Sequence, residues 1–441
     1  MTTKITEKNI SGIANSAVQW QSVITADGST NTTGVAGQGY FIDTTSATHT
    51  IVLPSSPNVG DTIQIRDYAA SFGTNNVTLD VGSLKLAGSA SNGLISTNDA
   101  MVTLVYSGED KGWLSVENEA KTNLIPPLFT SATGGTETTS GDYKIHSFTS
   151  SGCFAVSQLG NSPSVPAGGP TTVSYLVIAG GGGGGGNRGT GGGAGGGGGG
   201  AGGFREGKDT DDTYTASPLD AGSGITITAS TYPITVGAGG LGGPTGPTGN
   251  VASLGGQGSN SVFSTITSAG GGGGFMINAG GTQPTANGGS GGGGGADGDH
   301  PTTGGTGNTP PVSPPQGNPA GNGIGSGPGY GGGGGGGAGA AGGNGTTTTG
   351  GNGGNGVASS ITGSPVTRAG GGSSGTYQAN TPGTAGTGGG GTGASNGGVA
   401  TSGTANTGGG GGSVGTQGPG IPSGTTGAGG SGIVIIRYKY Q

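Results

Sequence analysis

Runs of glycine constrain this fold more than any other feature of the sequence. Glycine provides 119 of the 441 residues, and its uninterrupted runs include 180–186, 195–200, 291–295 and 331–337. Glycine loses more backbone freedom on folding than any other residue. Such a region therefore either stays flexible or offsets the entropy loss through dense backbone hydrogen bonding.

The residues between the runs argue against a flexible linker. Disordered segments are typically rich in Ser, Glu and Lys, whereas the charged residues between positions 213 and 430 are Asp220, Asp297, Asp299 and Arg368. Apolar, strand-like segments also border the runs, at 173–179, 232–236 and 433–440. We therefore expect the glycine-rich region to be ordered.

Two ordered structures are known for glycine-rich chains of this kind. A collagen triple helix needs glycine at every third position without interruption, and residues 243–249 keep that period for only two triplets. We expect instead polyglycine II, in which extended helices with three residues per turn bond sideways to their neighbours. A seven-residue run would rise roughly 20 Å at about 3.1 Å per residue, which is enough for one arm of a bundle.

Composition excludes several functional classes. The chain is 28% hydrophobic and 5% aromatic, too little for one large core, so we expect small β modules beside a glycine bundle. The net charge is −7 and the 13 basic residues are scattered, which argues against nucleic-acid binding. No apolar run has the length of a signal peptide or a membrane span. We therefore predict no signal peptide and no membrane insertion.

The predicted fold class is all-β, with a small N-terminal β sandwich or roll and a C-terminal β sandwich that carries a polyglycine II bundle. We divide the chain into an arm at 1–15, a β module at 16–119, a linker at 120–127 and a β scaffold at 128–441, with glycine excursions within 180–430. Period-two alternation predicts antiparallel strands in the N-terminal module at 50–53, 62–66, 77–81, 101–106 and 112–116.

The scaffold contains a second set of strands, predicted at 143–148, 152–156, 172–179, 224–228, 232–236 and 433–440. If the last of these pairs with 172–179, the glycine region is a series of excursions from one scaffold. Cys153 lies in the strand at 152–156 and is expected to be a small buried hydrophobe.

An internal repeat supports such excursions. Residues 264–274 and 360–372 both pass from a β-branched segment through Ala-Gly into a glycine run. The predicted unit is a strand, a glycine arm, a variable tip and a returning arm. The non-glycine interruptions are the candidate tips, namely 187–190, 275–290, 296–329, 373–382 and 394–407.

The sequence offers little for catalysis or metal binding. Asp297 and Asp299 are the only carboxylate pair deep in the glycine region, and two solvated turn aspartates explain them better than a glycosidase pair. The charged loop at 205–212 is expected to be solvated and lacks the pattern of a calcium loop. The histidines are far apart. We predict no enzyme activity, no catalytic residue, no cofactor and no metal site within one chain. His300 is kept as a metal ligand or a contact if the chain trimerises about an axis.

Recognition of another molecule is the positive expectation. Phe275, Tyr330 and Tyr377 lie beside glycine runs, and a sugar ring can stack on an aromatic face while nearby polar groups bond to its hydroxyls. The alternative is that these rings only pack on the bundle surface. The candidate binding residues in the tips are Phe275, Met276, Asn278, Asp297, Asp299, His300, Tyr330 and Tyr377.

These motifs resemble a known family. Tyr-Leu-Val-Ile-Ala-Gly-Gly-Gly-Gly at 175–183, Tyr-Pro-Ile-Thr-Val-Gly-Ala-Gly-Gly at 232–240 and Gly-Ser-Gly-Ile-Val-Ile-Ile-Arg-Tyr at 430–438 resemble the glycine-rich domain of tail-fibre and other virion proteins of marine phages, especially cyanophages. The resemblance covers about 143–440. Segments 37–45, 53–62 and 112–114 are similar to β modules of fibre and baseplate-associated proteins of the same phages. The bundle is similar in principle to adhesin tips of T-even-like phages, which lack these bordering strands.

The resemblance implies a phage fibre or adhesin that resides in the virion and is made in the host cytoplasm. Its tips would bind a host cell-surface glycan or outer-membrane receptor, and its N-terminal module would dock to other tail or baseplate proteins or form a homotrimer. The alternative is a connector or decoration protein of the virion that binds nothing. An ice-binding protein needs a flat, regular face, and the irregular tips argue against it. No binding residue matches a family motif, so none is carried over.

Overall fold

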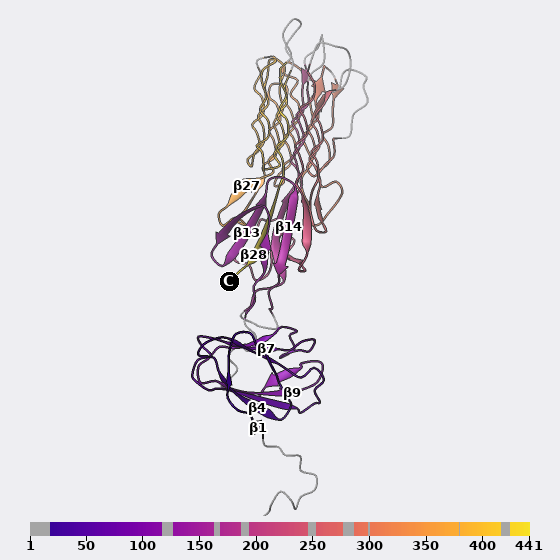
Figure 1. Cartoon of the computed structure of the whole chain (residues 1–441). Coiled ribbons are helices and arrows are strands. Elements are labelled where there is room, and N and C mark those ends of the chain that lie inside the picture. Colours follow the sequence, from indigo (N-terminus) through magenta and orange to yellow (C-terminus); the bar gives the residue numbers. More distant parts are fainter. Residues whose placement is uncertain are drawn as a thin grey trace, which may run out of the picture. The chain divides into compact units, whose positions relative to one another are not determined.

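The computed structural model describes residues 18–116, 127–162, 168–186, 194–245, 253–276, 286–298, 300–378, 380–415 and 424–441. Its described residues form strands, turns and extended segments and contain no helix, which confirms the all-β class (Figure 1). Accordingly, these residues offer no helix that could span a membrane. The predicted arm at 1–15 and most of the linker at 120–127 lie outside the described residues.

The chain divides into two compact units. Unit 1 comprises Met1–Leu128 with Gly160–Gly169, and unit 2 comprises Phe129–Leu159 with Pro170–Gln441. Unit 1 holds two sheets, in the orders β1-β4-β6-β9-β10, with β2 beside β4, and β3-β5-β7-β8. These strands are β1 (Gln19–Trp20), β2 (Ile24–Thr25), β3 (Thr32–Thr33), β4 (Gln38–Asp43), β5 (His49–Val52), β6 (Thr62–Asp67), β7 (Val77–Asp80), β8 (Gly93–Ile95), β9 (Met101–Tyr106) and β10 (Trp113–Ser115).

Unit 1 is a two-layer structure with mostly parallel pairing. The chain alternates between its sheets, so that β2, β4 and β6 lie parallel in one sheet and β3, β5 and β7 lie parallel in the other. The predicted strand positions are confirmed, but the antiparallel pairing is wrong for these strands. The reason is that each strand's connection to its parallel neighbour runs through the opposite sheet. Alternation of apolar residues reports which side is buried and carries no information on strand direction.

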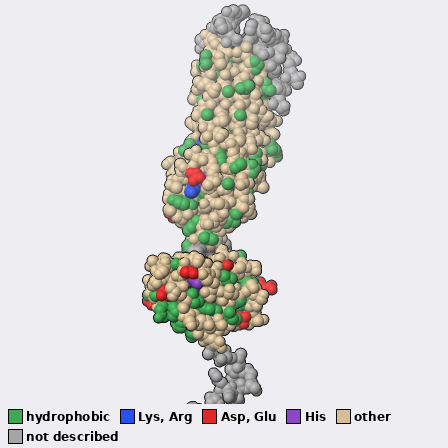
Figure 2. All heavy atoms as spheres, in the orientation of Figure 1, with side chains coloured by type: hydrophobic (Ala, Val, Ile, Leu, Met, Phe, Trp, Pro, Cys, Tyr) green, Lys and Arg blue, Asp and Glu red, His purple; other side chains and the backbone are tan. Residues whose placement is uncertain are grey.

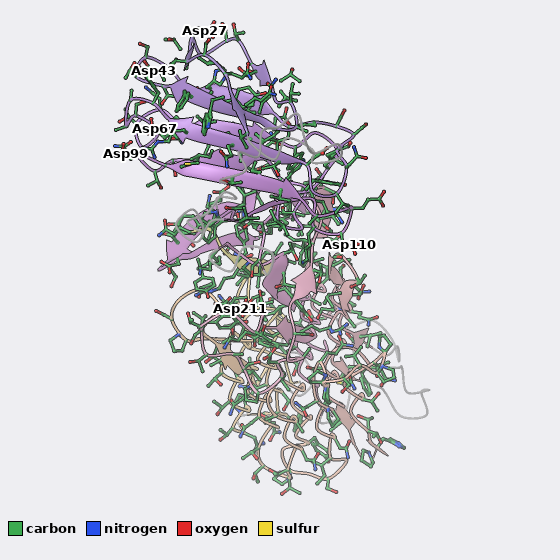
Figure 3. All side chains as sticks on the ribbon, turned by 90° about the horizontal axis from the view of Figure 1, so that it is seen from below. Asp27, Asp43, Asp67, Asp99, Asp110 and Asp211 are labelled. Carbon is green, nitrogen blue, oxygen red and sulfur yellow. The ribbon has the colours of Figure 1, made fainter. Side chains whose placement is uncertain are left out.

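Aspartates close the turns at one edge of the first sheet. Asp27 follows β2, and Asp43 and Asp67 end β4 and β6; Figure 3 shows these side chains along one edge of the sheet. Their carboxylates accept N–H groups two to five residues later. These hydrogen bonds, led by those from Thr30, hold the pKa of Asp27 below its ordinary value. The aspartates therefore redirect the chain from one sheet to the other.

The core of unit 1 lies between its two sheets. Its largest members are fully buried aromatic and β-branched or γ-branched side chains that point inward from both sheets and their turns, among them Ile42, Ile51, Ile63, Ile65, Phe72, Leu79 and Trp113. Inward residues alternate with more exposed ones along β6, as a half-buried strand requires.

The scaffold of unit 2 consists of two further sheets, in the orders β12-β13-β28-β15-β17, with β18 beside β15, and β11-β14-β19-β21-β22. The strands are β11 (Ser131–Thr133), β12 (Thr136–Ser140), β13 (Tyr143–Phe148), β14 (Gly152–Gln158), β15 (Thr172–Ile178), β17 (Phe204–Gly207), β18 (Ile225–Thr226), β19 (Thr231–Thr235), β21 (Ser261–Phe263), β22 (Ile266–Ser268) and β28 (Ile433–Lys439).

The last strand lies at the centre of its sheet. β28 pairs antiparallel with both β13 and β15, and the register places Ile178 opposite Ile433. The chain thus leaves the sheet after β15 and returns at the adjacent position of β28. This confirms that the glycine region is a series of excursions from one scaffold. Cys153 is a correction: it is exposed on β14, because Phe154 and Val156 take the core-facing positions of that strand.

The glycine arms are held by hydrogen bonds that repeat every three residues. In arm 180–186, successive N–H groups donate to three neighbouring segments in turn. Gly180 and Gly183 donate to the carbonyls of Ser259 and Gly256. Gly181 and Gly184 donate to Gly430 and Gly427, and Gly182 and Gly185 donate to Gly200 and Gly197. Its carbonyl groups accept from three others, at 240 and 243, at 271 and 274, and at 411. Six segments therefore surround this arm, with the period of a helix of three residues per turn.

Interior arms need glycine because they touch backbone to backbone. A Cβ atom on Gly182 would collide with the carbonyl of Gly272, and one on Gly183 with the carbonyl of Leu241. Figure 1 shows the arms as long, slender traces that extend from the β strands of unit 2. Their amide and carbonyl groups find partners in neighbouring arms, which offsets the entropy loss of ordering glycine.

The outer arms of the bundle are not continuous glycine runs in the sequence. Segments 302–308 and 316–324 are neighbouring arms, joined by hydrogen bonds from Ala320 to Gly305 and from Gly323 to Thr302, and 399–404 is also an arm. These segments fall in the predicted tips 296–329 and 394–407, so that part of the tip assignment is wrong. An outer arm faces other arms on one side only and needs glycine mainly at its inward positions, whereas its outward positions accept other residues.

Candidate functional site

Most of the predicted binding residues lie at one end of the glycine bundle. We call this the free end, the end remote from the scaffold strands β15, β19 and β28. There β16 (Ala194–Gly195), β24 (Ala296–Asp297) and β25 (His300–Pro301) form a small sheet, and β20 (Ser253–Leu254) pairs with β23 (Phe275–Met276). Gly195 also lies against the carbonyls of Tyr330 and Gly375. The fold thus gathers residues from several separate excursions.

Phe275 and Met276 are at the free end but inside it. Each side chain is 1% exposed, and Phe275 packs against Ala286 in a small cluster. The backbone of Phe275 joins two arms, because its N–H donates to Gly293 and its carbonyl accepts from Gly197. Both side chains support the free end from within and offer no surface to a ligand in this structure.

The hairpin of β24 and β25 presents His300. Asp297 is paired with His300 in the ladder, and the imidazole is exposed. Asn278, Asp299 and the side chain of Asp297 lie outside what the structure describes. No group of acidic, histidine or cysteine side chains that could hold a metal ion occurs among the described residues.

Tyr330 and Tyr377 form an aromatic pair at the free end, which we call the tyrosine tip. Their ring centroids are 5.9 Å apart, and the ring planes meet at 76°, an edge-to-face arrangement. Both residues are half-buried. The N–H of Tyr377 donates to the carbonyl of Gly329 over 2.9 Å, which fixes the two turns against each other.

Polar residues lie next to the two turns that carry the tyrosine tip. Asn380 donates through Nδ2 to the carbonyl of Tyr377 over 2.8 Å, and the main-chain carbonyl of Asn380 accepts a hydrogen bond from the Thr376 hydroxyl. Thr347 and Thr348 form an exposed turn beside Gly329. Sequence reasoning missed Asn380 and this threonine turn, although four successive threonines at 346–349 between glycine runs are a visible signal.

The tip is poor in charge. Between residues 221 and 367 the charged residues are Asp297 and Asp299. On the face drawn in Figure 2, red and blue side chains lie over unit 1 and over the scaffold of unit 2, and the described residues of the outer part of the bundle carry none. The arrangement can therefore stack against a ring and exchange hydrogen bonds, but it has no described group suited to a strongly charged ligand.

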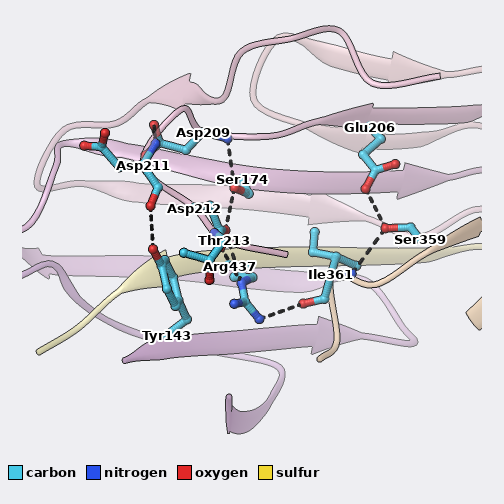
Figure 4. A network of polar contacts seen from close by, with 10 residues as sticks. All are labelled: Tyr143, Ser174, Glu206, Asp209, Asp211, Asp212, Thr213, Ser359, Ile361 and Arg437. Carbon is cyan, nitrogen blue, oxygen red and sulfur yellow. Dashed lines mark hydrogen bonds and ion pairs between the residues drawn. The ribbon is translucent and has the colours of Figure 1, made fainter. Parts of the chain in front are cut away.

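A buried polar network lies at the scaffold end of the bundle (Figure 4). The Nε atom of Arg437 is 2.9 Å from Oδ1 of Asp212, the Ser174 hydroxyl donates to Asp212 over 2.8 Å, and the guanidinium lies 4.4 Å from the ring centre of Tyr143. Asp212 and Asp209 are buried, so the predicted solvated loop is wrong here. The strands bring Arg437 beneath the loop, and the buried charge requires a partner.

The same network anchors the hairpin of β26 (Val357–Ser359) and β27 (Val366–Arg368). Arg437 donates to the carbonyl of Ile361, and the Ser359 hydroxyl donates to Glu206. The hairpin directly precedes arm 369–376, as β22 precedes the arm at 270–275, which confirms the repeated passage from strand to arm. This network joins loop, hairpin and last strand, and its buried position gives it a structural role.

Unit 1 carries a separate aromatic surface. The indole of Trp20 stacks on Phe41 with 4.4 Å between ring centroids, and Phe41 meets Tyr68 edge to face at 6.5 Å. Trp20 is 38% exposed and Tyr68 is 59% exposed. Gly39 lies under the indole, where a Cβ atom would come within 2.7 Å of the ring. This set forms an exposed aromatic ridge, defined by Trp20, Phe41 and Tyr68.

Comparison with known proteins identifies the larger part of the chain. The family model described as a glycine-rich domain matches residues 157–439. A search of curated proteins finds no match.

Proposed function

The chain belongs to the glycine-rich domain family, and from that premise we propose that it is a virion fibre or adhesin protein of a phage that binds a glycan on the host cell surface through the tyrosine tip. The observation that carries this proposal is the half-exposed pair of Tyr330 and Tyr377 at the free end. Asn380 and the threonine turn add polar groups next to the turns that hold the two rings.

The chemistry of the tip matches that of a sugar. A pyranose ring has an apolar face that packs on an aromatic ring and hydroxyl groups that exchange hydrogen bonds with amides and hydroxyls. The near absence of charge in this part of the sequence favours a neutral glycan. Ligand sites commonly combine a few aromatic surfaces with a small number of placed polar groups.

The bundle would serve as a rigid support. Each interior arm is fixed by hydrogen bonds in several directions, so that the short turns of the tip are held on a backbone lattice. We further propose that the arms are polyglycine II helices, because their partners repeat every three residues. A crystal structure should show φ near −75° and ψ near +145° along them, and a β-type ψ with a two-residue period would contradict this proposal.

Unit 1 would attach the protein to the virion. The aromatic ridge exposes Trp20 and Tyr68 in a unit that has its own core, and we assign it the contact with another tail or baseplate protein. A homotrimer would present three tips, and multivalency would strengthen a weak glycan contact by about 10²–10⁴-fold. The alternative remains a connector or decoration protein whose bundle is a spacer.

The test compares the full-length protein with the double variant Y330A/Y377A. Loss of the rings removes about 1.4 kcal/mol of stacking, so binding to host cells should fall about tenfold. The control V399A alters an exposed side chain of the outer arm 399–404 and should bind normally. Equal binding by the wild type and the double variant would contradict the tip site. Absence of binding by every folded protein would favour the connector.

A further inference from the structure

One flank of the bundle carries polar side chains at a regular spacing. In the outer arm 381–387, Thr381, Thr384 and Thr387 are exposed, whereas Gly383 and Gly386 are buried. A helix with three residues per turn presents every third residue to the same side. The three threonines therefore form one row along the arm, with about 9 Å between successive members.

A second row lies on the neighbouring arm. In arm 349–356, Asn352 and Asn355 are exposed, and their Oδ1 atoms accept the N–H groups of Thr384 and Thr387 over 2.8 and 3.1 Å. Oδ1 is thus occupied within the protein. The Nδ2 groups of the two asparagines and the hydroxyls of the two threonines have no hydrogen-bond partner among the described residues, which leaves them available at the surface.

The same use of asparagine recurs around the bundle. Oδ1 of Asn287 accepts from Thr306, and Oδ1 of Asn322 from Gly304. Each such side chain supplies an acceptor to an outward N–H group of the adjacent outer arm. What distinguishes arms 349–356 and 381–387 is that the asparagine and threonine rows lie side by side, in two matched pairs.

These rows begin at the tyrosine tip. Thr381 forms a bridge with Thr349, and the preceding residue, Asn380, donates to the carbonyl of Tyr377. The aromatic pair, Asn380 and the two rows are therefore continuous from the free end along the flank. We call Asn352, Asn355, Thr384 and Thr387 the polar rail.

From this continuity we infer that the ligand is an extended neutral polysaccharide, with one sugar ring on the tyrosine pair and the following sugars along the polar rail. The inference rests on the proposed function and adds the class of glycan. The rail supplies donors and acceptors at a constant repeat and no charge, which suits a neutral chain of repeating hydroxyl groups. Each contact is weak because exposed hydrogen bonds contribute little, so affinity grows with the number of sugars that reach the rail.

The experiment uses the full-length protein and an array of linear neutral oligosaccharides, from single sugars to octasaccharides. The wild type should bind longer chains progressively better, by about tenfold or more between the shortest and the longest chains that it recognises. The variant T384A/T387A should keep the affinity for short sugars and lose the gain with length. The matched control is T303A/T306A, which removes two exposed threonines at the same spacing from another outer arm.

The outcomes separate this inference from the proposed function. Affinity that is independent of chain length, while Y330A/Y377A still lowers binding about tenfold, overturns the polar rail and leaves the tyrosine tip standing. An equal loss in T384A/T387A and T303A/T306A overturns the assigned flank. If Y330A/Y377A binds every sugar as well as the wild type does, the tip itself is wrong.

Discussion

Asp212 and Arg437, which are 225 residues apart in the sequence, form a buried ion pair with 2.9 Å between Oδ1 and Nε. Their side chains are 2% and 3% exposed, and the pair joins the loop after β17 to the last strand. Because the hairpin of β26 and β27 is attached to the same arginine through Ile361, this pair links the start, middle and end of the glycine excursions at the scaffold.

Removal of one member of this pair should destabilise unit 2. In Asp212→Ala, the guanidinium of Arg437 stays buried without its counter-charge, and we expect the free energy of unfolding to fall by about 3–5 kcal/mol. Denaturant unfolding of the full chain measures this loss. The neighbouring Asp211 is exposed, so Asp211→Asn should change stability by less than about 0.5 kcal/mol. Similar losses in both variants would show that the ion pair has no special role.

His146 should make stability depend on pH. Its side chain is buried, its Nδ1 lies 2.7 Å from the carbonyl of Gly134, and its Nε2 lies 3.1 Å from the Tyr438 hydroxyl. Desolvation lowers the pKa of His146 from the ordinary value of 6.5. The unfolded chain therefore takes up a proton at a higher pH than the folded chain does.

The sign of this effect is specific. The contribution of neutral His146 to the free energy of unfolding is fully present above pH 6.5. It is lost as the pH falls below 6.5 toward the lowered pKa of the folded state. Thermal unfolding of the wild type and of His146→Gln should give a stability difference that moves in favour of the variant as the medium is acidified through this range. A difference that stays constant from neutral to acidic pH would contradict the assignment.

Interior glycines should tolerate no side chain. Gly182→Ala places a Cβ atom against the carbonyl of Gly272, and the rigid backbone lattice has little room to shift. We expect a loss of about 1–3 kcal/mol or failure of the bundle to form. The control is Gly152→Ala in β14, whose Cβ atom would meet only the ring of Phe148 at 3.8 Å. Full stability of Gly182→Ala would contradict backbone contact between the arms.

Gly39 should determine the position of the Trp20 ring. In Gly39→Ala, the new methyl group occupies the space beneath the indole, within 2.7 Å of the present ring atoms. The ring must lift from the sheet and lose its stacking on Phe41. Fluorescence quenching by acrylamide should increase, while the buried Trp113 keeps the rest of the emission unchanged. Unaltered quenching would show that Gly39 does not determine the position of the Trp20 ring.

Much of the fold could be predicted because its signals are local. The alternation at 143–148 and 101–106 reproduces β13 and β9 to the residue, since a strand buried on one face must alternate. The pairing of β28 with β15 followed from two apolar segments that border the glycine region. For the site, the choice of Tyr330 and Tyr377 rested on the scarcity of aromatic residues, and the structure brings these two rings together.

Other features depended on contacts between distant residues. Nothing local distinguishes Phe275, which is buried at the free end, from Tyr330, which is half-exposed there. From the local sequence Asp212 is predicted to be a surface residue, and only the fold places Arg437 beside it. The predicted tips include the outer arms at 302–308 and 399–404, because an outer arm has neighbours on one side only and needs no continuous glycine run.

The sequence by itself determined the all-β class, the strand positions and the need for a backbone-bonded glycine region, because alternation and the entropy of glycine act within a few residues. Only the tertiary structure decided the parallel direction of the strands in unit 1, the burial of Asp212 and Phe275, and the alignment of Asn352 and Asn355 with Thr384 and Thr387. Strand direction, burial and alignment between arms are set by which distant segments become neighbours, and the local pattern of a segment does not name its neighbours.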